Sequence, residues 1–149
     1  MSEAQITPEI QAEFTEYPLV AAQPGIWIAD QIAATGNSYA VAHYSELHGN
    51  IDRPCLDAAI RQAMSEADTV QAVFCLAEDG SVVQRLPHAR TPDQVQPVEW
   101  VDVSQRSDAV QAAQDLMQAD LAADLPADGA RPLYRQVMIR VSADCWFWY

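Results

Sequence analysis

The chain has 149 residues, half of them hydrophobic, which is enough for one domain with a buried core. Its formal net charge of −13 argues against binding of nucleic acid or of an anionic membrane through bulk electrostatics. Three widely spaced cysteines (Cys55, Cys75 and Cys145), no signal pattern and no long apolar run favour free thiols in a cytoplasmic protein.

The first part of the chain predicts a polar leader followed by a helix and a strand. Residues 1–17 are acidic and are expected to form a partly ordered leader. A helix is predicted over 22–34, because Pro24 is tolerated in a first turn. The alternation over 40–48 then predicts a strand, which ends at Gly49.

A second helix is predicted over 53–67. Asp52 is a candidate N-cap, and Ile51 and Leu56 are placed as a hydrophobic staple. Apolar residues recur at helical spacing along this segment, at Leu56, Ile60, Met64 and Ala67.

The middle of the chain predicts a β-hairpin. Two strands, over 70–76 and 82–86, flank Asp79 and Gly80, a dipeptide typical of two-residue hairpin turns. A loop with three prolines follows (Pro87, Pro92 and Pro97), and 98–103 predicts a further short strand.

The last third predicts a helix and two strands. Ser107 is the candidate cap of a helix that carries Val110, Ala113, Met117 and Leu121 along one face. After a loop that contains Asp128 and Gly129, a strand over 133–141 pairs with one over 145–149. The order of elements predicts a mixed α/β protein with helices covering a sheet.

The chain ends on four consecutive aromatic residues, Trp146 to Tyr149. Such a run is typical of a strand inside a packed core. We expect the chain to be a fragment of a larger enzyme, whose last strand is left exposed at an edge and invites self-association. The alternative is a small domain in which this strand is central and well covered.

No residue can be assigned a catalytic or metal-binding role from the pattern alone. His43 and His48 fall on opposite faces of one predicted strand, and His88 lies in the proline-rich loop, so each is expected to be structural or exposed. Asp120 and Asp124 lie one helical turn apart and are expected on a solvated helix face. No nucleophile elbow, phosphate-binding loop or dinucleotide fingerprint is present.

Two stretches nevertheless resemble motifs of nonribosomal peptide synthetase condensation domains. Ala22, Gln23 and Trp27 match the first motif, Ser-x-Ala-Gln-x-Arg-Leu-Trp, with Ile26 in place of its leucine. The second motif, Arg-His-Glu-x-Leu-Arg-Thr-x-Phe, is degenerate. Phe74 matches its last residue, and Asp68 and Val70 replace the glutamate and the leucine. The stretches 38–44, 116–121 and 146–149 resemble siderophore-type members of this family.

The resemblance implies the N-terminal part of a chloramphenicol-acetyltransferase-like lobe over 18–149. The family's catalytic motif, His-His-x-x-x-Asp-Gly, is absent from the sequence, so no catalytic residue is carried over and the chain alone is expected to be inactive. The parent enzyme is expected to be an amide-forming transferase or ligase. It would join an aryl acyl group, such as 2,3-dihydroxybenzoyl, to serine, both held on phosphopantetheine arms.

The implied partners are an aryl-carrier protein, a downstream peptidyl-carrier domain and the rest of the synthetase chain. No cofactor is expected to bind this fragment itself. Two alternatives stay open: a non-catalytic module that binds a carrier protein, and an acyltransferase whose active-site histidine comes from another chain.

Overall fold

The computed structural model describes residues 14–32, 40–88, 91–123, 125 and 133–149. Within these ranges strands and helices are mixed along the chain, which confirms the predicted α/β class. In chain order the elements are β1 (Phe14–Pro18), α1 (Gln23–Ile32), β2 (Ser45–His48), α2 (Arg53–Glu66), η1 (Asp68–Gln71), β3 (Val73–Leu76), β4 (Val82–Pro87), η2 (Pro92–Gln94), β5 (Glu99–Asp102), α3 (Ala109–Ala122), β6 (Val137–Arg140) and β7 (Cys145–Trp148).

The larger of two sheets has four strands in the order β2-β7-β6-β5. Strands β6 and β7 pair antiparallel, as the sequence predicts, and β5 lies parallel to β6. Strand β2 pairs antiparallel with the other side of β7. The last strand is therefore central, and the expectation that it is exposed at an edge is wrong. Self-association stays a prediction, and the edges of the described sheet that would serve it are β2 and β5.

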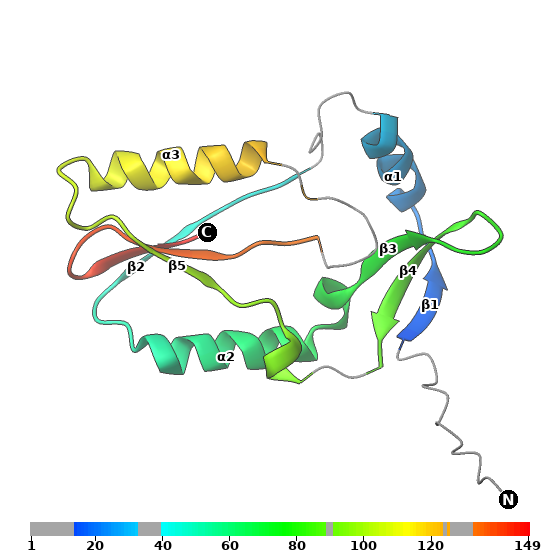
Figure 1. Cartoon of the computed structure of the whole chain (residues 1–149), viewed down its shortest axis with the longest axis horizontal. Coiled ribbons are helices and arrows are strands. Elements are labelled where there is room, and N and C mark those ends of the chain that lie inside the picture. Colours follow the sequence, from blue (N-terminus) through cyan, green and yellow to red (C-terminus); the bar gives the residue numbers. More distant parts are fainter. Residues whose placement is uncertain (1–13, 33–39, 89–90, 124, 126–132) are drawn as a thin grey trace, which may run out of the picture.

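Helices cover both faces of this sheet, α3 on one and α2 on the other (Figure 1). Side chains of a strand alternate between the two faces, so neighbours in sequence join different cores. Ile139 and Phe147 pack with the α3 residues Ala113 and Met117. Met138 lies on the opposite face with Ile60 of α2.

The same alternation explains the aromatic run at the end of the chain. Phe147 is 3% exposed and belongs to the α3 core. Trp146 and Trp148 are half-buried against the α2 core, where Trp146 meets Trp100 edge-on at 6.0 Å between ring centroids. Because a helix covers each face of β7, residues on both faces of this strand contact apolar side chains. This accounts for an unbroken aromatic run where a half-exposed strand would alternate with polar residues.

A second, smaller sheet has the order β1-β4-β3 and lies beside α1 (Figure 1). Strand β1 falls at the end of the expected acidic leader, where no strand was predicted. The negative charge of Glu16 in β1 is paired with Arg85 of β4, whose Nε donates to Glu16 Oε1 at 2.8 Å. The hydroxyl of Thr15 also forms a hydrogen bond with His88 Nε2, at 2.8 Å. The strands thus form two sheets rather than one mixed sheet.

The hairpin between β3 and β4 forms, with a turn one residue longer than predicted. Gly80 N donates to Ala77 O at 3.0 Å, and Ala77 N donates to Ser81 O at 2.8 Å. The turn therefore holds residues 78–80. Gly80 has φ of 81°, a left-handed conformation that glycine adopts without steric cost.

The ends of the helices confirm one predicted cap and correct another. Asp52 caps α2, because its carboxylate accepts a hydrogen bond from Cys55 N at 3.0 Å. At α3 the N-cap is Asp108, without a side-chain cap bond, and not Ser107. Val110 is exposed rather than buried, since the face of α3 toward the sheet carries Ala112, Ala113 and Met117.

Five predicted strands are shorter in the structure, at 45–48, 73–76, 99–102, 137–140 and 145–148. The 3-10 helix η1 replaces the start of the strand predicted from residue 70. The expected loops around Gly36 and Asp128 lie outside the described residues.

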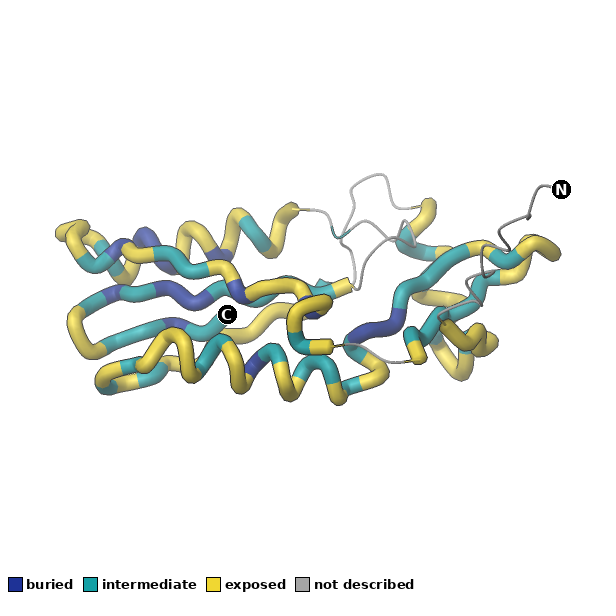
Figure 2. Tube along the Cα trace, turned by 60° about the horizontal axis from the view of Figure 1, so that its bottom comes forward, coloured by how far each residue is buried: buried dark blue, intermediate teal, exposed yellow. Residues whose placement is uncertain are grey.

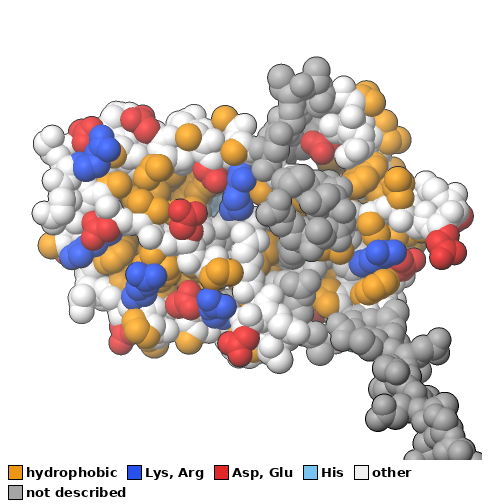
Figure 3. Space-filling view, in the orientation of Figure 1, with side chains coloured by type: hydrophobic (Ala, Val, Ile, Leu, Met, Phe, Trp, Pro, Cys, Tyr) orange, Lys and Arg blue, Asp and Glu red, His pale blue; other side chains and the backbone are white. Residues whose placement is uncertain are grey.

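Burial is concentrated in the larger sheet and its helices, and again where η1 leads into β3 (Figure 2). At the surface, acidic and basic side chains lie next to one another (Figure 3). Each arginine among the described residues is engaged: Arg61, Arg85, Arg106, Arg135 and Arg140 with carboxylates, and Arg53 over the ring of Trp100. No helix in the described ranges is both long and apolar enough to cross a membrane.

Candidate functional site

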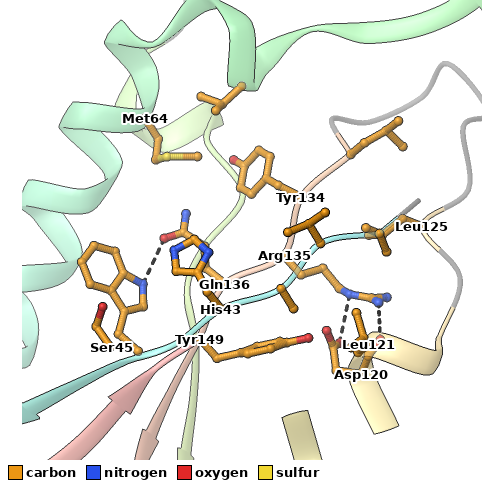
Figure 4. Close-up of a pocket in the computed structure, with 16 residues that line it drawn as sticks. His43, Ser45, Met64, Asp120, Leu121, Leu125, Tyr134, Arg135, Gln136 and Tyr149 are labelled. Atoms are coloured by element: carbon orange, nitrogen blue, oxygen red, sulfur yellow. Dashed lines mark hydrogen bonds and ion pairs between the residues drawn. The ribbon is translucent and has the colours of Figure 1, made fainter. Parts of the chain in front are cut away.

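A cavity of about 390 Å³ lies at the end of β7, between the end of α3 and the segment before β2 (Figure 4). Trp148 of β7 and the next residue, Tyr149, line the cavity, and Met64 of α2 lines it from the other side. Most of the wall is apolar. The lining side chains that carry polar atoms are His43, Ser45, Asp120, Tyr134, Arg135, Gln136, Trp148 and Tyr149.

An ion pair between Asp120 and Arg135 forms one end of the cavity. Arg135 Nε lies 2.9 Å from Asp120 Oδ1, and both side chains are 27% exposed. Arg135 Nη2 also donates to the backbone oxygens of Asp120 at 2.8 Å and Ala123 at 3.0 Å. The guanidinium therefore satisfies the last carbonyls of α3, where a cation is also favoured by the helix dipole.

Tyr149 joins this pair from the end of β7, and its ring points toward Asp120 in Figure 4. Burial, the hydrogen bond of its hydroxyl to Asp120 and the charge of that carboxylate raise the pKa of Tyr149 above 10.0, while Arg135 lowers it. The backbone of Tyr149 is fixed by two hydrogen bonds with Val137, each 2.9 Å long. The phenol is therefore a neutral, positioned donor at pH 7.

The opposite wall offers polar groups that are only partly used. Trp148 Nε1 donates to Gln136 Oε1 at 3.3 Å. Among the described residues, the buried Tyr134 hydroxyl and Gln136 Nε2 have no hydrogen-bond partner. A buried polar atom without a partner costs about 1–3 kcal/mol, so these two atoms lower the stability of this wall of the cavity.

The predicted site residues fall in different places. His43 lines the cavity, in a segment without strand pairing, whereas His48 lies on β2. His88 is at the end of β4, bonded to Thr15. The three histidines therefore belong to separate features, and the prediction that His43 and His48 lie on one strand is wrong. Asp120 is ion-paired at the cavity rather than on a solvated face, which corrects that prediction, and Asp124 lies outside the described residues.

Several residues at the cavity were not found from the sequence. Arg135 and Tyr149 belong to no recognisable sequence motif, because their partner Asp120 lies in a different part of the chain. The local signal was a pair of charged residues, Arg135 and Arg140, inside the apolar stretch 133–141. Such a charge is seldom buried without a partner.

A second group of polar side chains lies away from the cavity, on the β2–β7 pair. His48 Nε2 lies 2.9 Å from Glu46 Oε1, and Cys145 Sγ donates to the same oxygen at 3.5 Å. Burial, the bond to Glu46 and its charge raise the pKa of the Cys145 thiol. A raised pKa lowers the fraction of thiolate, the nucleophilic form, so this environment does not activate Cys145.

Comparison with known proteins gives a family match over nearly the whole chain. The model of the family described as Condensation domain matches residues 13–149. Enterobactin synthase component F of Escherichia coli K12 is 39% identical over 132 residues, which is 89% of this chain and 10% of that protein. A dimodular nonribosomal peptide synthase of Bacillus subtilis is 33% identical over 135 residues, 90% of this chain and 5% of that protein.

Solved structures give the same result. The starter condensation domain of rhizomide synthetase RzmA has a TM-score of 0.79 and 30% identity, over 90% of this chain and 31% of that one. The first condensation domain of the calcium-dependent antibiotic synthetase has a TM-score of 0.77 and 25% identity, with the same coverage. The chain thus spans about a tenth or less of these curated relatives and about a third of these solved domains.

Proposed function

Because the chain belongs to the condensation-domain family of nonribosomal peptide synthetases, we propose that it is the N-terminal part of such a domain in a siderophore synthetase of the enterobactin type. The parent enzyme then joins a carrier-bound aryl acyl group, such as 2,3-dihydroxybenzoyl, to carrier-bound serine. In this proposal the domain includes β1 and starts by residue 13, where the family match begins, so the leader expected over 1–17 is at most the residues before it, and the domain continues beyond Tyr149 into its catalytic motif. The free cysteines suit a cytoplasmic enzyme.

One observation carries the proposal. The chain aligns over 90% of its own length with a solved starter condensation domain, yet with only 31% of that domain. The siderophore assignment rests on the 39% identity to enterobactin synthase component F. The proposed partners are an aryl-carrier protein, a downstream peptidyl-carrier domain and the rest of the synthetase chain.

The reaction is aminolysis of a thioester. The amine nitrogen of serine attacks the acyl carbonyl, a C–N bond forms and the C–S bond breaks. The sulfur leaves on the phosphopantetheine arm of the donor carrier and takes up a proton, and the amine gives up its own. The chemistry needs a positioned amine and a group that accepts its proton.

The described residues suit a supporting role in this chemistry. In the family the catalytic motif follows the aromatic strand, so in the parent it would begin next to Tyr149, at the rim of the cavity. The ion pair of Asp120 with Arg135, together with the bond to Tyr149, fixes the end of β7. We assign His43, His48 and His88 no catalytic role, and we expect the 149-residue chain to be inactive alone.

A chimera tests the proposal. The matched 132-residue segment of enterobactin synthase component F from Escherichia coli is replaced by the corresponding part of this chain. With aryl-charged and seryl-charged carriers, we expect the chimera to make the amide, detected by mass spectrometry. A matched chimera carries the Bacillus subtilis segment, which is 33% identical to this chain.

Four outcomes are decisive. Amide formation that survives His43→Ala but is lost on mutation of the host's own catalytic histidine supports the scaffold role. No amide from a chimera that is folded, while the Bacillus chimera is active, contradicts the proposal. Amide formed by the isolated 149-residue chain contradicts its inactivity, and saturable binding of an aryl-carrier protein by a chimera that makes no amide favours a non-catalytic binding module.

A further inference from the structure

Three side chains of metal-ligand type converge on the α3-side face of the β2–β7 pair, at the end where His48 lies opposite Cys145. They are Glu46 and His48 of β2 and Cys145 of β7. Their donor atoms, a carboxylate oxygen, an imidazole nitrogen and the thiol sulfur, all lie within 4.8 Å of one another. The cluster is separate from the cavity, and no step of the proposed reaction uses it.

The backbone holds these side chains in place. His48 and Cys145 lie directly opposite each other in the antiparallel pair. Glu46 is two residues before His48 and therefore projects from the same face of the strand. Gly49 N donates to Asp144 O at 2.7 Å, which continues the strand pairing beyond the cluster. The three donors are thus presented by paired strands rather than by a loose loop.

One of the separations matches an edge of a tetrahedral zinc site, and a second is shorter than such an edge. Bond lengths of about 2.3 Å to sulfur and about 2.1 Å to oxygen, at a tetrahedral angle, place these two ligands about 3.6 Å apart. The distance from Cys145 Sγ to Glu46 Oε1 is 3.5 Å. The same reasoning places nitrogen and oxygen ligands about 3.4 Å apart. Here His48 Nε2 and Glu46 Oε1 are 2.9 Å apart, so a small outward movement suffices.

We propose that Glu46, His48 and Cys145 bind one Zn²⁺ ion, with water as the fourth ligand. Thiolate, imidazole and carboxylate are the ligands that zinc prefers, and the fourth position is open because His48 is 69% and Glu46 49% exposed. The thiolate and the carboxylate neutralise the charge of the ion, and the neighbouring Asp144 adds a negative charge. The Cys145 proton is released to solvent on binding. The ion would fasten the edge strand β2 to β7.

Cobalt(II), which reports on zinc sites through its spectrum, is the probe. The reduced, metal-free 149-residue protein is titrated with Co²⁺. We expect a thiolate-to-cobalt charge-transfer band that saturates at one ion per chain and is removed by Zn²⁺. Cys145→Ser abolishes the band, and Glu46→Gln and His48→Ala each weaken Zn²⁺ binding roughly tenfold or more. The matched control is Cys55→Ser, because Cys55 is an exposed thiol outside the cluster and should leave the band unchanged.

Thermal unfolding gives a second readout. An ion that binds the folded state raises the melting temperature, so Zn²⁺ should stabilise the wild-type chain and not Cys145→Ser. Far-UV circular dichroism of the metal-free variants checks that they fold. If Cys145→Ser is unfolded, the Glu46→Gln and His48→Ala variants, at exposed positions, test the proposal in its place. Absence of the band, its persistence in Cys145→Ser, or its equal loss in Cys55→Ser overturns the proposal. None of these results bears on the amide-forming function, which the chimera tests separately.

Discussion

Trp27 of α1 packs against Phe74 of β3, with ring centroids 6.4 Å apart and planes inclined by 34°. These two residues come from the two stretches that resemble condensation-domain motifs, and the fold brings them together. The contact connects α1 to the smaller sheet. It gives the aromatic residues of both motifs a structural role in this chain, since neither lines the cavity at the end of β7.

Replacing Trp27 by alanine should lower the free energy of unfolding by about 1–3 kcal/mol, because a large contact of α1 is lost. Urea denaturation followed by circular dichroism measures the change. In a double-mutant cycle with Phe74→Ala, the coupling energy should be about 0.5–1.5 kcal/mol. Ile28→Ala, at a side chain that is 59% exposed, serves as the control. Strict additivity of the two aromatic substitutions would show that the rings do not interact in solution.

The parts of the fold that were predictable from sequence are those specified by local signals. Helix α2 has its cap, its staple and its apolar spacing within one short stretch, and it forms as predicted. Strand β1 was missed because its support is distant: Glu16 looks like a residue of an acidic leader until Arg85 is placed across from it. The central position of β7 likewise depends on β2, which lies about a hundred residues earlier in the chain.

The candidate site was less predictable for the same reason. Asp120 on an amphipathic helix is expected to face solvent, and only the folded chain shows that Arg135 and Tyr149 meet it. Glu46, His48 and Cys145 have no metal-motif spacing, because the antiparallel register and not the sequence interval brings them together. Family resemblance was informative where residue patterns were not, since it depends on many weakly informative positions at once.

The two helix caps provide a matched pair of substitutions. Asp52→Ala should destabilise the protein by about 1 kcal/mol, because the Cys55 backbone N–H loses its acceptor at the start of α2. Ser107→Ala should change stability by less than about 0.5 kcal/mol, since Ser107 is not the cap of α3. Chemical denaturation of both variants is the measurement. An equal cost at both positions would contradict the observed capping geometry.

Phe147 should be among the most costly core positions. It is 3% exposed, belongs to the same core as Met117 and Ile139, and its ring centroid lies 4.9 Å from that of Tyr44. Phe147→Ala is therefore expected to lower the free energy of unfolding by about 3–5 kcal/mol. Val41→Ala, at a side chain that is 92% exposed, should lower it by no more than about 0.5 kcal/mol. A small effect at Phe147 would mean that β7 is not the central strand in solution.

The raised pKa of Tyr149 predicts how the free energy of unfolding depends on pH in the alkaline range. Its pKa is raised in the folded state, first by burial and then by Asp120, so above the unfolded value of about 10 the native chain holds more protons than the unfolded chain. The stability that Tyr149 contributes is therefore complete below about pH 10 and is lost as the pH rises through the raised folded value. Tyr149→Phe should remove this part of the alkaline slope in the free energy of unfolding.

Asp120→Asn tests the cause of that shift. Without the carboxylate, both its hydrogen bond and its charge no longer favour the protonated phenol, so the pKa of Tyr149 should fall toward 10.0. Ultraviolet absorbance of tyrosinate during a pH titration measures this, with Tyr149→Phe subtracted to isolate the one residue. Asp115→Asn, on an exposed face of the same helix, controls for a general change in charge. Because burial is the larger cause, the pKa should remain above 10.0 in Asp120→Asn. An unchanged titration in that variant would show that Asp120 and Tyr149 are not in contact, and that the end of β7 is held by its backbone bonds to Val137 instead.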